Sequence, residues 1–122
     1  MRRLLLVDKN PYDLEAMRAA LSSPDVEIET ADDGDDALTI ALERPPDVVI
    51  AASSLGQMGG FALSRELKRF GESGRIPTPR VIVLLERRQD GWLASWSRCD
   101  AWATKPVEDG ELEELVGAPT AS

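Results

Sequence analysis

The sequence predicts a doubly wound α/β domain built on a parallel sheet. Short, almost wholly apolar runs, of which residues 4–7 and 81–85 are the clearest, alternate with segments whose apolar residues recur at helical spacing. Such strands are buried on both faces, because each crossover between parallel strands lays a helix on the sheet. A chain of 122 residues, 43% of them hydrophobic, suits a single core. We therefore expect one domain over residues 1–117 and a flexible tail over residues 118–122.

The first two strand–helix units are indicated by apolar runs and by helix-start residues. Residues 4–7 predict a buried strand, and Asn10-Pro11 then predicts a helix start, because Asn caps free N–H groups and Pro suits the first turn. Residues 26–30 alternate apolar and polar side chains, which predicts a second strand. The acidic run at residues 32–36 leads into a second helix, whose positive dipole end favours carboxylates.

Three further units complete the chain. The glycine-rich stretch at residues 56–60 lacks the spacing of a nucleotide-binding loop and predicts a turn. A short helix is expected between the fourth and fifth strands. The expected elements are strands at 47–51, 81–85 and 101–104, and helices that begin near residue 61, span 90–97 and span 109–116.

Composition excludes several classes of function. The chain has no histidine, which removes the commonest general base and metal ligand. Its single cysteine, Cys99, permits no internal disulfide and is expected to pack as a small hydrophobe. The formal net charge of −8 disfavours direct binding to nucleic acid. No stretch resembles a membrane span or a signal peptide, so we expect a cytoplasmic protein.

Four motifs occur in an order and spacing that resemble those of the receiver domain of bacterial two-component response regulators. They are LLLVD at residues 4–8, PDVVI at 46–50, GGF at 59–61 and, most specifically, TKP at 104–106. The resemblance implies a flavodoxin-like (βα)5 three-layer sandwich with strand order 2-1-3-4-5. It also makes the Lys105-Pro106 peptide a candidate for the cis form.

The same resemblance implies that the phosphorylation pocket is degenerate. Receivers take a phosphoryl group from a histidine kinase onto an aspartate that ends the third strand, with the help of a divalent metal; Ala52 stands at that position here. Lys9 stands where the family has a second metal-holding acid, and Leu85 where it has a Thr or Ser. Asp8 and Lys105 are retained. We therefore expect no catalysis, no bound metal and no cofactor.

Charges in this pocket lead to a further expectation. Asp8, Lys9 and Lys105 together carry a charge near +1, so Mg²⁺ is expected to bind weakly or not at all. We expect Asp8 to pair with Lys105. Local capping or solvation by Asp8 is the alternative that the sequence leaves open, and for Lys9 an orientation toward solvent is favoured over a role in the pocket.

The tryptophans mark a candidate interface. Trp102 stands where the family carries an aromatic residue whose position reports activation. Trp92 and Trp96 are four residues apart and would share one face if their segment were helical throughout. Core packing and anchoring of a partner remain equal alternatives for this pair. Arg98 stands where the family often ends this helix with glycine, which predicts a strained turn.

The function that these features favour is a receiver-like signalling module that works through protein–protein contacts, independently of phosphorylation, with a homodimer as one form. Two alternatives stay open. One is a switch triggered by a small anion bound at Lys9, Lys105 and the backbone near Ser53 and Ser54. The other is phosphotransfer through a substitute acceptor such as Ser53, although its hydroxyl has no evident base.

Overall fold

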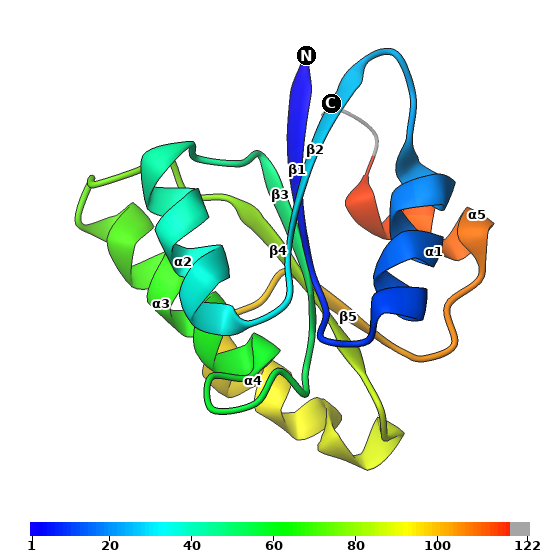
Figure 1. Ribbon diagram of the computed structural model, residues 1–122. Coiled ribbons are helices and arrows are strands. Elements are labelled where there is room, and N and C mark those ends of the chain that lie inside the picture. Colours follow the sequence, from blue (N-terminus) through cyan, green and yellow to red (C-terminus); the bar gives the residue numbers. More distant parts are fainter. Residues whose placement is uncertain (118–122) are drawn as a thin grey trace.

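The computed structural model describes residues 1–117, which form a five-stranded parallel sheet between two layers of helices (Figure 1). The strand order is β2-β1-β3-β4-β5, so the predicted fold and order are confirmed. The expected tail at residues 118–122 lies outside the described residues. The elements are β1 Arg2–Val7, α1 Pro11–Leu21, β2 Val26–Ala31, α2 Gly34–Glu43, β3 Val48–Ala52, α3 Gly60–Glu72, β4 Arg80–Leu85, the 3-10 helix η1 Arg88–Trp92, α4 Leu93–Ser97, β5 Ala101–Thr104 and α5 Asp109–Val116.

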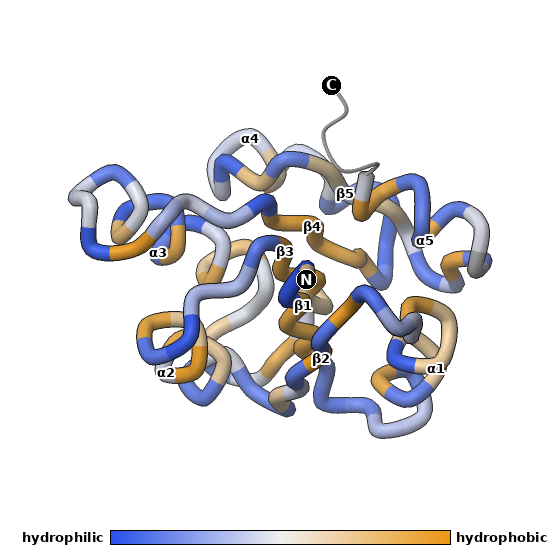
Figure 2. Tube along the Cα trace, turned by 90° about the horizontal axis from the view of Figure 1, so that it is seen from above, coloured by the Kyte–Doolittle hydropathy of each residue, from blue (hydrophilic) through white to orange (hydrophobic). Residues whose placement is uncertain are grey.

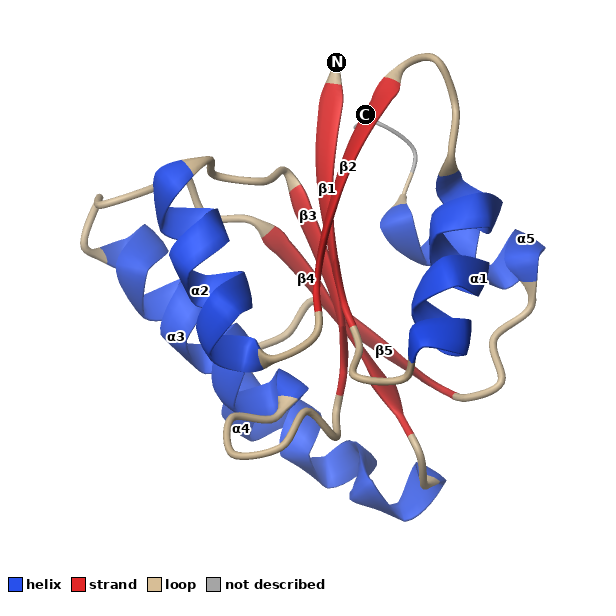
Figure 3. Ribbon diagram, in the orientation of Figure 1, coloured by secondary structure: helices blue, strands red, loops and turns tan. Residues whose placement is uncertain are grey.

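The sheet separates two apolar cores. Helices α1 and α5 cover one face and α2, α3 and α4 cover the other (Figure 3). Side chains of β3 alternate between them: Val48 and Ile50 pack on the α1/α5 side, whereas Val49 and Ala51 pack on the α2/α3 side. Apolar residues are accordingly concentrated along the strands between the helical layers (Figure 2). None of the described helices is long and apolar enough to cross a bilayer.

Side-chain caps begin the first two helices; the sequence predicted the cap at Asn10, whereas for the second helix it predicted only carboxylates near the start. The side chain of Asn10 accepts hydrogen bonds from the backbone N–H groups of Tyr12 and Asp13, at 2.9 and 3.2 Å. The side chain of Asp33 accepts from the N–H of Asp36 at 2.8 Å. These bonds satisfy N–H groups that lack partners within the helix, and they set where α1 and α2 start relative to the strand ends.

The turn between β3 and α3 requires glycine because it passes very close to the end of β3. A Cβ atom on Gly59 would lie 2.4 Å from the carbonyl oxygen of Ser53, and one on Gly60 would lie 2.3 Å from that of Ala52. Gly60 also donates its N–H to the Ser53 carbonyl at 3.2 Å. The glycines therefore allow α3 to begin directly against the end of β3.

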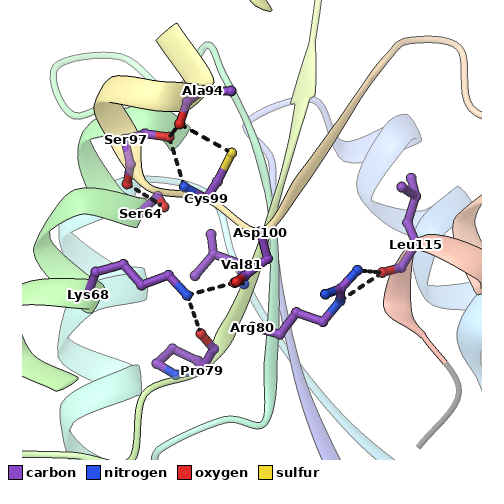
Figure 4. Close-up of polar contacts among 10 residues, drawn as sticks. All are labelled: Ser64, Lys68, Pro79, Arg80, Val81, Ala94, Ser97, Cys99, Asp100 and Leu115. Atoms are coloured by element: carbon purple, nitrogen blue, oxygen red, sulfur yellow. Dashed lines mark hydrogen bonds and ion pairs between the residues drawn. The ribbon is translucent and has the colours of Figure 1, made fainter. Parts of the chain in front are cut away.

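A buried lysine connects α3 to the amino-terminal ends of β4 and β5. Lys68 is only 8% exposed, and its Nζ donates to the carbonyl of Pro79 at 2.9 Å and to Asp100 Oδ2 at 2.6 Å (Figure 4). The same Asp100 oxygen accepts the N–H of Val81 at 2.7 Å. The cation thus joins the starts of β4 and β5 to the middle of α3, and its charge is compensated where it is buried.

The carboxyl end of α5 is held by two arginines from strand starts. Arg80 donates to the carbonyl of Leu115 through Nε and Nη2, at 3.0 and 2.9 Å (Figure 4). Arg2 donates to the carbonyls of Val116 and Gly117 at 3.3 and 3.0 Å. Cations are stabilising at this end of a helix because its last carbonyls lack partners and carry partial negative charge.

The segment between β4 and β5 differs from the single short helix expected over residues 90–97. It consists of η1, which is wound as a 3-10 helix, followed by five residues of α-helix in α4. Trp92 and Trp96 therefore do not lie on one continuous α-helix. Arg98 ends α4 at φ 62°, in the left-handed conformation that favours glycine, as expected from the sequence. Cys99 is half-buried against the α2/α3 core.

Replacing Arg98 by glycine should stabilise the protein. Glycine adopts the left-handed conformation without the clash of a Cβ atom, so Arg98→Gly is expected to raise Tm by about 2–4 °C in calorimetry. Arg98→Ala is the matched control: it removes the exposed ion pair with Glu72 equally but keeps the Cβ atom. An equal change in Tm for the two variants would show that the backbone of Arg98 is not strained.

Candidate functional site

The carboxyl ends of four strands meet at one edge of the sheet, where a doubly wound fold places its functional crevice. Asp8 follows β1, Ala52 ends β3, Leu85 ends β4 and Lys105 follows β5. Backbone hydrogen bonds hold these ends in register: Ser53 donates its N–H to the carbonyl of Leu84 at 2.8 Å, and Lys105 donates to that of Leu85 at 2.8 Å. The Lys105-Pro106 peptide is cis, as the resemblance implied.

Asp8 and Lys105 form the expected ion pair. Lys105 Nζ lies 2.7 Å from Asp8 Oδ2, and the two side chains are 13% and 2% exposed. Asp8 Oδ1 accepts the N–H of Asn10 at 2.9 Å, so the carboxylate also orders the turn before α1. Pairing with Lys105 and local capping, which the sequence left as alternatives, therefore occur together through the two oxygens of one carboxylate.

Two further carboxylates, which sequence reasoning missed, approach the same ammonium group. Asp13 Oδ2 lies 2.9 Å and Glu86 Oε2 lies 3.4 Å from Lys105 Nζ. Asp13 stands in the first turn of α1, and Glu86 directly follows β4. Both are acids that lie in the sequence close to a strand end, and this position could have identified them as candidate residues of the site. Only the spatial arrangement shows that they share one cation.

The environment of Lys105 raises its pKa. Burial removes water from the ammonium group and lowers the pKa, but hydrogen bonds to Asp8 and Asp13 outweigh this effect, so the pKa of Lys105 lies above its ordinary value of 10.5. Lys105 is therefore charged throughout the physiological range. It is a fixed cation and has no role as a general base there.

The structure places Lys9 in solvent, as the sequence favoured, and corrects the expected charge of the pocket. The Lys9 side chain is exposed, and no ion pair among residues 1–117 involves it. Asp8, Asp13 and Glu86 set three negative charges against the one positive charge of Lys105. The formal charge is −2 rather than +1, because acids distant in sequence fold toward Lys105 while Lys9 turns to solvent.

The positions expected to have lost their chemistry are apolar and buried. Ala52 and Leu85 are both 0% exposed and belong to the α2/α3 core. Ser53 is half-buried and Ser54 is exposed. No hydrogen bond among the described residues involves either serine hydroxyl, so the structure holds no base against them.

The three tryptophans are all exposed, at 71% for Trp92, 47% for Trp96 and 39% for Trp102. The ring of Trp102 lies over Gly91, where an added Cβ would come within 2.7 Å of the ring. The guanidinium of Arg65 stacks 4.8 Å from the centre of the Trp96 ring and donates to the Trp96 carbonyl at 2.9 Å. Trp92 is thus not a core residue. Trp96 packs against Arg65, and Trp102 packs against Gly91.

The residues at the strand ends do not fit a resident Mg²⁺ ion. Mg²⁺ demands near-octahedral oxygen ligands. Ala52 offers no ligand, Lys9 is a cation turned to solvent, and both Asp8 oxygens already accept hydrogen bonds, from Lys105 Nζ and from the N–H of Asn10. Within the described part of the chain, the one group of three acids with oxygens within 4.8 Å of one another is Asp32, Asp33 and Asp36, at the start of α2.

Removing the Lys105 ammonium should destabilise the fold strongly. Lys105→Met leaves the buried Asp8 without its counter-ion, and we expect the free energy of unfolding in urea at pH 7 to fall by about 3 kcal/mol. Lys9→Met is the matched control and should change it by less than about 0.5 kcal/mol, because Lys9 is exposed. Asp8→Asn combined with Lys105→Met should cost less than the sum of the single changes. Additive costs would contradict the pairing.

Alkaline pH should remove the contribution of Lys105 to the free energy of unfolding. Because the folded-state pKa of Lys105 is raised, its stabilising effect is fully present below the unfolded pKa and is lost as the pH rises through the folded value. The stability difference between wild type and Lys105→Met should therefore be constant from pH 7 to about 10 and shrink at higher pH. A constant difference up to pH 12 would contradict this prediction.

Several known proteins are similar to this chain in sequence. The family model of the response regulator receiver domain matches residues 4–116. The chain is 28% identical to Protein PilH of Pseudomonas aeruginosa over 123 residues, covering 99% of both chains. It is 31% identical to the Response regulator PleD of Caulobacter vibrioides over 118 residues, which is 97% of this chain but only 26% of PleD.

Solved structures show the same fold. The chemotaxis response regulator CheY4 of Vibrio cholerae superposes with a TM-score of 0.83 at 23% identity, covering 95% of this chain and 96% of CheY4. A response regulator from Burkholderia pseudomallei, solved with a phosphorylated aspartic acid, calcium ion and citrate, gives a TM-score of 0.79 at 19% identity, over 95% of this chain and 66% of that one. The fold, the strand-end lysine and the family match together establish that this chain belongs to the response regulator receiver domain family of two-component signalling.

Proposed function

We propose that this receiver domain signals independently of phosphorylation, without catalysis of its own, through contacts with another protein. The observation that carries the proposal is the side chain at the end of β3: Ala52 is fully buried and offers only a methyl group at the position of the family's acceptor aspartate. A methyl group neither attacks a phosphoryl donor nor ligates a metal.

The state of Lys105 supports the proposal. In a phosphorylated pocket this lysine would be available to a phosphoryl oxygen. Here its ammonium group is 2.7 Å from Asp8 and 2.9 Å from Asp13, and Glu86 lies 3.4 Å away. A phosphoryl group would have to displace these carboxylates and lie beside them, which like-charge repulsion disfavours. The ion cluster thus already provides the partners of the Lys105 ammonium group.

The position at the end of β4 adds to this argument. Leu85 replaces the hydroxyl that the family uses as a hydrogen-bond donor to the phosphoryl group, and it is fully buried in the α2/α3 core. Ala52 and Leu85 are the last residues of β3 and β4, and both are apolar. Neither of these two residues presents a polar side-chain group to the crevice. Three of the family's polar groups are therefore absent, counting the acid replaced by Lys9.

The surface around the tryptophans is the proposed contact with the partner. We call Trp92, Trp96 and Trp102 the tryptophan surface; large exposed aromatics are typical anchors of protein interfaces. The segment from Arg87 to Arg98 carries three arginines and one aspartate, a charge of +2, in a chain whose net charge is −8. A basic segment with aromatic anchors suits a partner that presents acidic and apolar side chains.

Phosphodonor treatment tests the loss of phosphorylation. Incubation with acetyl phosphate and Mg²⁺, followed by intact-mass measurement, should add no phosphoryl group, because no acceptor carboxylate ends β3. A receiver with its acceptor aspartate serves as the positive control in the same reaction. Stoichiometric phosphorylation of this chain would refute the proposal, and its loss in Ser53→Ala or Ser54→Ala would identify a serine acceptor.

Sedimentation and capture experiments test the tryptophan surface. We expect Trp92→Ala combined with Trp96→Ala to abolish capture of a specific partner from a lysate of the source organism, or to dissociate a homodimer in sedimentation velocity. Tyr12→Ala is the matched control, because Tyr12 is an aromatic residue that is 85% exposed but lies on α1, across the sheet. Equal loss of binding in both variants, or in neither, would contradict the assignment of the surface.

A further inference from the structure

A cleft of about 410 Å³ lies beside Lys105, between α1 and the connection from β5 to α5. Its walls include Met17 of α1, Leu84 of β4 and Leu112 of α5, which are 5%, 3% and 3% exposed. Both helices lie on the same face of the sheet (Figure 1). The volume falls within the range of small-molecule sites, and six of the ten lining residues are apolar while the other four are charged.

The polar groups of the cleft are the four members of the ion cluster at Lys105. Asp8, Asp13 and Glu86 outnumber the single ammonium, so the rim has a formal charge of −2. A small anion, the alternative ligand that the sequence left open, would meet three carboxylates here, while Lys9 remains in solvent. The electrostatics of the cleft therefore oppose an anion and favour a cation.

Two carboxylate oxygens at the rim are available to such a cation. Asp13 uses Oδ2 for Lys105, and Glu86 contacts Lys105 only through Oε2 at 3.4 Å. No hydrogen bond among residues 1–117 occupies Asp13 Oδ1 or Glu86 Oε1, and the two side chains are 45% and 55% exposed. By contrast Asp8 is fully engaged, by Lys105 and by the N–H of Asn10.

We propose that this cleft binds a small molecule that combines an apolar body with a protonated amine. The apolar body packs against Met17, Leu84 and Leu112, and the ammonium group donates hydrogen bonds to the carboxylates of Asp13 and Glu86. Charge-assisted hydrogen bonds of this kind are stronger than neutral ones, and they are strengthened further at the edge of an apolar cavity.

This site is separate from the position of the family's phosphoacceptor. Ala52 does not line the cleft, which lies on the α1/α5 side of the sheet, whereas Ala52 packs in the α2/α3 core. The proposal does not depend on the tryptophan surface or on the absence of phosphorylation. A failure of the binding test would leave the proposed function unaffected.

Three probes that share a phenylethyl group and differ in the charge of their polar group test the proposal. Phenethylamine, 2-phenylethanol and 3-phenylpropionate are titrated into the folded protein, and methyl NMR shifts of Met17 and Leu112 are followed. We expect saturable shifts with phenethylamine at a Kd of about 1 mM or tighter, binding of the alcohol at least about tenfold weaker, and no saturation with the carboxylate. Equal affinity for the three probes, or no saturable shift with phenethylamine, overturns the proposal.

Variants locate the binding. Glu86→Gln is expected to weaken phenethylamine binding about tenfold, because it removes a carboxylate only loosely tied to the fold. Ala16→Phe fills the cleft from α1 and should abolish binding. Asp35→Asn, a change at an exposed acid on α2, is the matched control and should leave affinity unchanged. Unchanged affinity in both Glu86→Gln and Ala16→Phe, with their NMR spectra still those of a folded protein, overturns the assignment.

Discussion

The ion cluster at Lys105 is the interaction on which the functional edge of this domain depends. Lys105 and Asp8 are 97 residues apart in the chain, yet their side-chain atoms meet at 2.7 Å and both are largely buried. Placing two charges away from water is costly unless each is compensated, and here each one compensates the other. Through Asp13 and Glu86 the same ammonium also contacts the first turn of α1 and the end of β4. Three strand ends and one helix are joined by a single cation.

This cluster stabilises strand ends that lie next to an apolar end of β3. Acids that crowd together repel one another, and a nearby cation removes that repulsion. In this chain Lys9, which follows Asp8, turns to solvent, and Ala52, at the end of β3, joins the apolar core. Lys105 then neutralises Asp8 directly. The edge of the sheet remains ordered through groups supplied by the chain itself.

The two sides of the sheet have different consequences for function. On the α2/α3 side the apolar core continues to the strand ends through Ala52 and Leu85, and the tryptophans lie beyond it on η1, α4 and β5. On the α1/α5 side the core opens into the cleft beside Lys105. The β5–α5 connection, which starts at Lys105, follows the strand that carries Trp102. A ligand in the cleft and a partner on the tryptophan surface would therefore contact the two ends of one short segment of chain.

The sequence by itself determined the fold class, the helix start at Asn10 and a helix after the acidic run at residues 32–36, because these depend on local patterns of apolar spacing and capping. The strand order followed from the resemblance of its motifs to the receiver family. It also indicated the Asp8–Lys105 contact and the left-handed turn at Arg98. Only the tertiary structure decided the direction of Lys9, the participation of Asp13 and Glu86, and the division of residues 88–97 into a 3-10 and an α-helical part. The physical reason is that a charged side chain on a short connection can point either to solvent or to the pocket at similar cost. The preferred direction depends on carboxylates that come close to one another only after the sheet has formed.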